Sequence, residues 1–315
     1  MFAKYHEKDL LRLLPSLNEA FAKARPDDPD VQERRSEMLE RLEALKAASG
    51  GKTRIALVCM TPRSGSTLLA EALAKTGKLG NPGEWFNLNP GSNIEKMISA
   101  YGCQTREELL DAIYAHSATD NGVAIIKGDF NQCLPFIYDG LFQRHFDMVK
   151  FAMLTRQDVL AQAISRFIGF QTKSWSSLQK AETTEVTYDQ DGVDKQLEFL
   201  LRMEASWKRF LGAHGIKYQA FTYEDLNKDL ARRVVMIGRM LKEDVQVEMS
   251  VEDLSLKKQG TSRNQDWAKD YAGESRKESI RAMRTIEKKV VRQAERAAQE
   301  GMAQDPAEPA DAPSD

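Results

Sequence analysis

The sequence predicts an α/β protein whose open parallel sheet is flanked by helices. Four short apolar runs, each typical of a buried strand, lie at residues 55–60, 123–126, 149–154 and 216–221. Helical patterns follow three of these runs, from about Ser66, Gln157 and Asp225. Strand followed by helix, repeated, is typical of a parallel sheet, and such sheets bind ligands at the carboxyl ends of their strands. Functional residues are therefore expected just after the four runs.

Charge and composition disfavour several classes of protein. The chain has 315 residues, and 45 Lys and Arg stand against 47 Asp and Glu, which gives a net charge of −2 and no general affinity for nucleic acid. No apolar run approaches the roughly 18 to 20 residues of a membrane helix, and charged residues stand where a signal peptide would be apolar. The three cysteines and four histidines are scattered. We therefore expect a cytoplasmic protein without a bound metal.

Both ends of the chain differ from the central part. Two amphipathic helices are expected before about residue 48, joined by a turn at 25–30 in which proline ends one helix and aspartate caps the next. We expect this helical hairpin to pack on the main domain or on a partner such as a second copy of the chain. A charged helix and then a flexible tail rich in Ala, Pro and Asp are expected at the other end. The predicted domains are 1–53, 54–272, 273–300 and 301–315.

A turn suited to an anion follows the first strand. Residues 61–67 read Thr-Pro-Arg-Ser-Gly-Ser-Thr, and a glycine-containing turn that opens a helix presents free N–H groups and the positive end of the helix dipole. The turn departs from the nucleoside-triphosphate loop, because Met60 stands at its first glycine and Ser66 at its lysine. A capped helix start without a ligand is the alternative.

A second candidate anion site follows the third strand. That strand ends at Thr155-Arg156, and Ser165 lies about two turns into the next helix, so a guanidinium and a hydroxyl could bind one phosphate together. Taken alone, Arg156 fits a salt bridge equally well. Two anion sites at two strand ends of one sheet suit a nucleotide that is phosphorylated at both ends.

These motifs resemble those of sulfotransferases. Residues 61–67 resemble their 5′-phosphosulfate loop, and Arg156 with Ser165 resembles their 3′-phosphate motif. The finer resemblance is to the bacterial trehalose sulfotransferase-like family and covers about residues 54–272. Its further motifs stand at 83–86, 162–165, 171–175 and 223–226, at Glu204 with Trp207, and at Lys258-Gln259 followed by Trp267.

The resemblance implies a P-loop-like open sheet and the transfer of a sulfuryl group from 3′-phosphoadenosine 5′-phosphosulfate (PAPS) to a hydroxyl. The acceptor would be a carbohydrate or a related small molecule, and no metal cofactor is implied. The predicted nucleotide-binding residues are Arg63, Ser64, Gly65, Ser66, Thr67, Arg156, Ser165 and Lys258. Trp85, Gln171 and Trp175 are the predicted acceptor-binding residues, because aromatic rings can stack on a sugar and an amide can hydrogen-bond to it.

Sulfuryl transfer needs cations near the leaving phosphate and a proton acceptor near the attacking hydroxyl. Arg63 and Lys127 are the candidate cations. Glu84 is the predicted base, because it matches the glutamate to which the trehalose-type family assigns this role. Asp129 is the alternative base. Lys127-Gly128-Asp129 stands where cytosolic sulfotransferases have Lys-Thr-His, and the third residue of that motif is their base.

Two other functions remain open from the sequence. An ATP-dependent phosphotransferase on a modified phosphate loop would need a loop lysine, which Ser66 replaces, but Asp129 could serve its metal ion. The second alternative is a non-catalytic module that binds the nucleotide in the same pocket. Such a module would not need the carboxylates Glu84 and Asp129.

Overall fold

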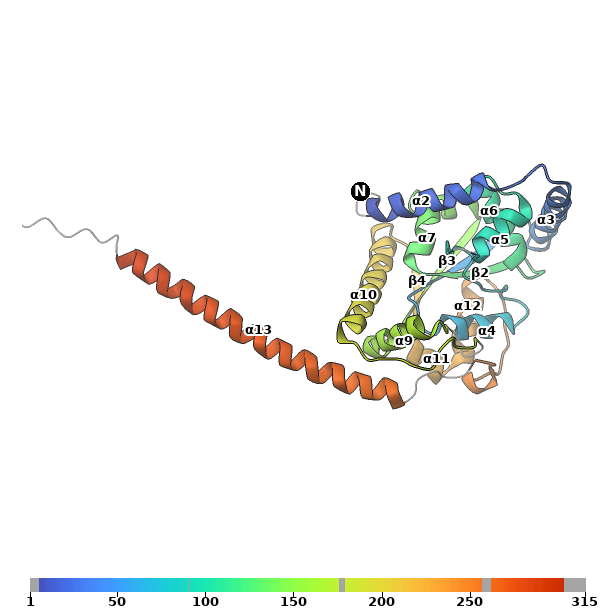
Figure 1. Cartoon of the computed structure of the whole chain (residues 1–315). Coiled ribbons are helices and arrows are strands. Elements are labelled where there is room, and N and C mark those ends of the chain that lie inside the picture. The colour runs from blue at the N-terminus through green and yellow to red at the C-terminus, as the bar shows by residue number, and fades with distance from the viewer. Residues whose placement is uncertain (1–5, 90, 176–178, 257–261, 303–315) are drawn as a thin grey trace, which may run out of the picture. The chain divides into compact units, whose positions relative to one another are not determined.

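A computed structural model of the chain describes residues 6–89, 91–175, 179–256 and 262–302. The chain divides into two compact units, Met1–Gly260 and Thr261–Asp315. The first unit holds the sheet and most of the helices, and the second holds one long helix (Figure 1). Each unit is described by itself.

The first unit is built on a four-stranded parallel sheet. Its strands are β1 (Arg54–Met60), β2 (Val123–Gly128), β3 (Met148–Thr155) and β4 (Tyr218–Thr222). Their order is β2-β1-β3-β4, and every neighbouring pair is parallel. All four predicted strands and the predicted fold class are confirmed. The carboxyl ends of the strands meet at one edge, since Met60 pairs with Leu154 and Thr155 with Thr222.

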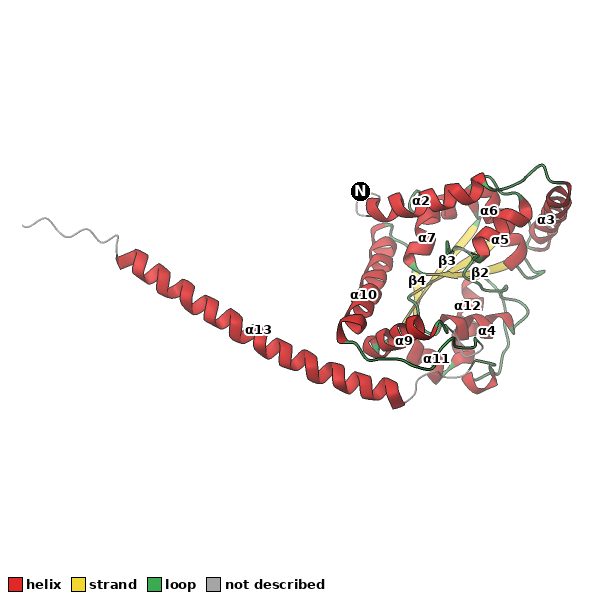
Figure 2. Cartoon of the chain, in the orientation of Figure 1, coloured by secondary structure: helices red, strands yellow, loops and turns green. Residues whose placement is uncertain are grey.

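Helices cover both faces of the sheet (Figure 2). In chain order they are α4 (Ser66–Ala74), α5 (Asn93–Tyr101), α6 (Arg106–Ser117), α7 (Phe130–Ile137), α8 (Leu141–His145), α9 (Val159–Thr172), α10 (Gln190–Ala213), α11 (Tyr223–Lys228) and α12 (Leu230–Met240). A short 3-10 helix follows at Val251–Asp253. The helices predicted after β1, β3 and β4 correspond to α4, α9 and α11.

Side chains of the strands alternate between two buried cores, one on each face of the sheet. Along β1, Leu57 belongs to one cluster and its neighbour Val58 to the other. The first core is closed by α5–α8 and α10, and the second by α4, α11 and α12. Because both faces are buried, the strands read as continuous apolar runs, which is why they could be located from the sequence.

The two predicted N-terminal helices are α2 (Glu7–Ala22) and α3 (Pro29–Ala48). Asp28 caps α3 by accepting a hydrogen bond from the Asp30 N–H at 3.0 Å, as predicted for this turn. Helix α2 contacts α7 and α5, and α3 contacts α5 and α6. Leu17 and Leu45 enter the first core. Both helices therefore pack on the α/β domain.

The second unit contains α13 (Ser262–Met302), which begins before the predicted start at residue 273. Its apolar side chains from Ile280 to Val291 are exposed. The predicted tail lies outside the described residues from position 303 on. Among the described helices, none is both long enough and apolar enough to cross a bilayer.

Candidate active site

The predicted anion loop lies between β1 and α4, at the carboxyl edge of the sheet. Gly65 precedes α4 with a φ of +85°, a left-handed conformation that favours glycine. A Cβ atom there would also lie 2.6 Å from Cδ2 of Tyr223, at the start of α11. Both the backbone angle and the packing of Tyr223 therefore require glycine at this position.

The loop is fixed by two helices that follow later in the chain. The buried Gln162 of α9 donates through Nε2 to Thr61 Oγ1 at 2.8 Å and to the Pro62 carbonyl at 2.7 Å. The fully buried Trp207 of α10 donates through Nε1 to the Met60 carbonyl at 3.2 Å. The end of β1 is thereby held rigidly, as a preorganised site needs.

The two predicted anion sites lie side by side. Arg63 Nε donates to Ser165 Oγ at 3.0 Å, which joins the loop after β1 to the helix after β3. Another nitrogen of the same guanidinium, Nη1, donates to the Trp175 carbonyl. Because β1 and β3 are neighbouring parallel strands, the residues that follow them meet at one edge of the sheet.

Positive charge is concentrated between these two sites. Burial, and then the nearby positive charge of Arg156, lower the pKa of Arg63. The Arg156 guanidinium lies 4.9 Å from the centre of the Tyr223 ring, and its buried Nε has no hydrogen-bond partner. The buried hydroxyl of Ser64 also lacks a partner. Unsatisfied donors beside two guanidinium groups suit an anionic ligand.

A lysine joins the loop to a carboxylate. Lys127, at the end of β2, is only 6% exposed. Its Nζ donates to Thr67 Oγ1 at 3.0 Å and to Glu84 Oε1 at 3.1 Å. The Glu84 side chain is 34% exposed, so it can reach a ligand as well as the lysine. The two predicted catalytic groups Lys127 and Glu84 are therefore in direct contact.

The backbone around Glu84 is held against the sheet. Gly83 forms an isolated parallel bridge with Ile126, and its carbonyl accepts from the Lys127 N–H at 3.0 Å. This bridge extends the pairing on the β2 edge and places Glu84 beside the end of that strand. The second carboxylate oxygen of Glu84 accepts from Gln132 Nε2 at 3.3 Å.

Asp129 caps helix α7. Its Oδ1 accepts from the Gln132 N–H at 2.9 Å, and Gln132 Oε1 accepts from the Asp129 N–H at 3.3 Å, which completes a capping box. Burial above all, with a smaller contribution from the neighbouring Glu84, raises the pKa of Asp129 to about 6. Gln132 thus links the two carboxylates that the sequence proposed as base.

The raised pKa of Asp129 predicts a pH-dependent effect of Asp129→Asn on stability. An unfolded aspartate has a pKa near 3.8, so above that value the folded chain holds a proton that the unfolded chain has lost. The bound proton stabilises the folded chain. Its contribution to the free energy of unfolding is fully present below pH 3.8 and is lost as pH rises through about 6, a loss of about 3 kcal/mol at most. The melting temperature of the variant minus that of wild type should therefore increase from pH 4 to pH 7.

Thermal unfolding of both proteins across this pH range measures the difference. Asp158→Asn changes the capping residue of α9 at an exposed position and controls for the chemical change itself. A difference that stays flat or falls with pH would show that burial does not govern the charge of Asp129.

The predicted acceptor-binding residues lie in three different surroundings. Trp85 is 8% exposed, and its ring meets His116 edge-on, with centroids 4.8 Å apart. The Gln171 amide makes two hydrogen bonds with the backbone of Thr187. Its Nε2 donates to the carbonyl at 2.9 Å, and its Oε1 accepts from the N–H at 2.8 Å. Trp175 is 40% exposed. Acceptor binding by these residues stays a prediction.

One predicted nucleotide-binding residue, Lys258, lies outside the described residues. Within the ranges that the structure describes, no group of three or more His, Cys, Asp or Glu side chains is arranged to hold a metal ion.

Several residues that organise the site were not among the predicted site residues. Gln132 donates a hydrogen bond to Glu84, and Gln162 donates to Thr61 of the loop. Tyr223 packs against Gly65 and Arg156. The spacing of Asp129 and Gln132 is a capping-box pattern and could have revealed the first of them. The roles of Gln162 and Tyr223 depend on contacts between distant segments.

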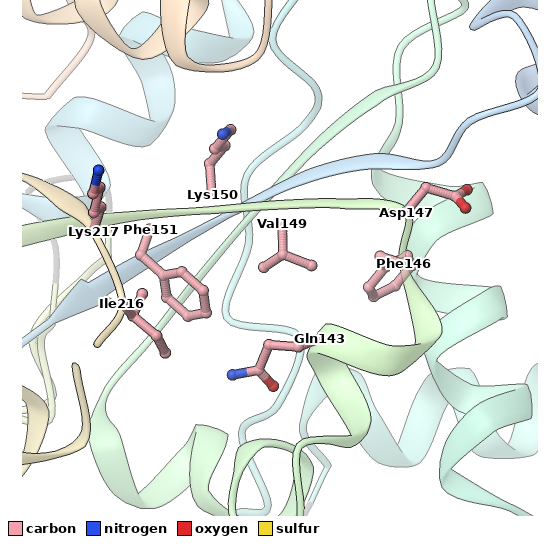
Figure 3. A pocket seen from close by; sticks show the side chains of 8 residues that line it. All are labelled: Gln143, Phe146, Asp147, Val149, Lys150, Phe151, Ile216 and Lys217. Carbon is pink, nitrogen blue, oxygen red and sulfur yellow. The ribbon is translucent and has the colours of Figure 1, made fainter. Parts of the chain in front are cut away.

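A hollow of about 390 Å³ lies away from this site, beside the amino end of β3 (Figure 3). In it, Val149 and Phe151 point to one side of the strand, and Lys150 points to the other. It contains none of the predicted site residues. Because parallel sheets bind ligands at the opposite, carboxyl edge, we assign it no part in the chemistry.

Taken together, the fold and the site define a class: an α/β protein with a candidate anion-binding loop and a lysine–carboxylate pair at the carboxyl edge of a parallel sheet. The sequence profile of a family described as Stf0 sulphotransferase matches residues 56–127 and 137–274. The chain belongs to this sulfotransferase family. The predicted family and enzyme class are confirmed.

Two curated relatives support the same assignment. The trehalose 2-sulfotransferase of Mycobacterium tuberculosis strain Erdman is 24% identical over 255 residues, and the match covers 70% of this chain and 94% of the relative. The trehalose 2-sulfotransferase of Mycolicibacterium smegmatis is 21% identical over 260 residues, and the match covers 71% of this chain and 96% of the relative.

Proposed function

We propose that this protein transfers a sulfuryl group from PAPS to a hydroxyl of a carbohydrate or related small acceptor, with Glu84 as general base. The observation that carries the proposal is the position of Lys127, which contacts the loop residue Thr67 and the carboxylate of Glu84. A transferase of this kind needs a cation near the leaving phosphate and a proton acceptor near the attacking hydroxyl.

The residues around the loop fit a nucleotide phosphorylated at both ends. Residues 63–67 would hold its 5′ end through the N–H groups that open α4 and through their hydroxyls. Arg156 and Ser165 would hold the 3′-phosphate, and the unpartnered Nε of Arg156 supports this role. The bound nucleotide would supply an activated sulfuryl group on its 5′-phosphate.

In the proposed reaction, an oxygen–sulfur bond forms to the acceptor while the bond between sulfur and the phosphate oxygen breaks. Glu84 takes the proton of the acceptor hydroxyl. Lys127 and Arg63 neutralise the negative charge that develops on the leaving phosphate. Lys127 is nearly buried, and electrostatic stabilisation is stronger where water is largely excluded.

Glu84 is preferred over Asp129 as the base for two reasons. Glu84 is in contact with Lys127, whereas Asp129 caps α7. Glu84 also lies inside the residues that match the family, whereas Asp129 lies in the gap between the two matched stretches. The raised pKa of Asp129 keeps it as the alternative, because a base works best with a pKa near the working pH.

A carbohydrate acceptor is supported by the names of the two relatives, both trehalose 2-sulfotransferases. Trp175 is the predicted acceptor-binding residue with the most exposed ring, and its carbonyl accepts a hydrogen bond from Arg63. An acceptor that stacks on this ring would therefore lie close to the nucleotide loop. Trp85 and Gln171 would support the acceptor pocket.

Nucleotide-induced stabilisation tests the proposal. We expect 3′-phosphoadenosine 5′-phosphate to raise the melting temperature without added metal, because a ligand that binds only the folded state stabilises it. At a concentration 100 times Kd the shift should be about 5 to 10 °C for a domain of this size. The measurement is a thermal melt with this nucleotide, with adenosine 5′-phosphate, or with ATP and magnesium. A larger shift with ATP and magnesium would favour a phosphotransferase instead.

A further inference from the structure

Helices α9 and α10 lie side by side (Figure 1). Side chains of both helices line a second hollow, of about 420 Å³. Three cations line it: Arg166 from α9, and Lys195 and Arg202 from α10. Glu198 is the one acidic residue among its lining residues. The hollow is therefore positive, although the whole chain has a net charge of −2.

The sequence of α10 places these cations on one face of the helix. Lys195, Phe199 and Arg202 are spaced by four and then three residues, which aligns their side chains. Lys195 and Arg202 are exposed, and within the described part of the chain neither takes part in an ion pair. Elsewhere on this helix, Lys208 pairs with Glu204. Both charges in the hollow can therefore act on a ligand.

Arg166 provides a more rigid cation at the wall of the hollow. Its guanidinium lies 3.9 Å from the centre of the Phe199 ring and 4.7 Å from that of Phe170. Its Nη1 donates to Gln196 Oε1, but its buried Nε has no hydrogen-bond partner. A planar guanidinium held between two rings is suited to a carboxylate or a phosphate.

The hollow borders the candidate active site. Arg166 directly follows Ser165, which accepts from Arg63 of the loop. Phe170 meets Trp175 edge-on, with ring centroids 4.9 Å apart. Asp129 is close enough to Arg166 for the two charges to influence each other. One ligand could therefore span the hollow and the reacting centre.

We propose that this hollow binds an anionic group, a carboxylate or a phosphate, carried by the acceptor. The acceptor would then be an acidic sugar or a sugar phosphate, with its reacting hydroxyl at Glu84 and its anionic group among Arg166, Lys195 and Arg202. Phe170 and Phe199 would pack against its apolar faces. This inference rests on the proposed function and specifies the acceptor of the same site.

Matched acceptors test the inference. Sulfate transfer from PAPS is measured with trehalose and trehalose 6-phosphate, and with cellobiose and its glucuronate-ending counterpart. We expect kcat/KM to be at least tenfold higher for the anionic member of one pair or both, and the preference to fall with added salt. The pair that responds distinguishes a phosphate from a carboxylate.

The double variant Lys195→Ala/Arg202→Ala should reduce the preference for the anionic acceptor at least tenfold, which is about 1.4 kcal/mol.

Lys217→Ala, in the other hollow, is the matched control and should leave the preference unchanged. Equal kcat/KM within both pairs, or a preference that survives the double variant, would overturn the inference while leaving sulfate transfer intact. If no acceptor is sulfated, the inference is tested by calorimetry, which measures the affinity of the nucleotide-saturated protein for each of the four sugars. Tighter binding of an anionic sugar, lost in the double variant, supports the inference, and any other pattern contradicts it. Failure of the nucleotide itself to bind would count against the proposed function.

Discussion

Glu84→Gln is expected to lower kcat by about two to four orders of magnitude, the usual contribution of a general base. The amide keeps the size of the side chain but cannot accept the proton of the acceptor hydroxyl. Affinity for 3′-phosphoadenosine 5′-phosphate should change little, because Glu84 contacts the loop only through Lys127. Steady-state transfer of labelled sulfate measures kcat, and calorimetry measures the affinity.

Glu19→Gln is the matched control, because Glu19 lies on α2 and pairs with Lys23 at 2.7 Å. It should keep kcat within about twofold of wild type. If Glu84→Gln also kept kcat, the base would not be Glu84, and Asp129→Asn would then be expected to cause the loss.

The second large effect is expected for Arg156→Ala, which should weaken nucleotide binding by about 10- to 100-fold. Charge-assisted hydrogen bonds contribute about 1.5 to 3 kcal/mol, and each 1.4 kcal/mol corresponds to a factor of ten. At saturating nucleotide, kcat should fall much less, because the 3′-phosphate is remote from the sulfuryl group. Titration of the variant with 3′-phosphoadenosine 5′-phosphate gives the affinity directly.

Arg239→Ala removes an exposed arginine from α12 and serves as the control. Because Arg156 also lies over the Tyr223 ring, melting temperatures of both variants show whether the loop is still packed. Normal nucleotide affinity with lost turnover would contradict the assignment of Arg156 to the 3′-phosphate.

The sheet could be predicted from the sequence because its strands are buried on both faces. The second run was expected to end at Ile126, but β2 continues through Lys127 and Gly128. Lys127 is charged and yet buried, since it pairs with Glu84, and no apolar pattern reveals such a residue. The helix α7 that follows was also missed, although Asp129 and Gln132 carry its capping signal.

The site could be predicted only in part. The loop after β1 and Arg156 after β3 were expected near each other, because parallel strands bring such residues to one edge. The contact of Lys127 with both Thr67 and Glu84 could not be read from spacing, since the three residues lie on separate segments. The burial of Trp85 against His116 likewise depends on tertiary packing.

A crystal structure with 3′-phosphoadenosine 5′-phosphate is the most direct test of the nucleotide site. We expect the 5′-phosphate within hydrogen-bond distance of the N–H groups of residues 64–67. The 3′-phosphate of the same molecule should contact Arg156 and Ser165. A nucleotide bound with either phosphate away from these residues, or bound elsewhere on the protein, would contradict the account.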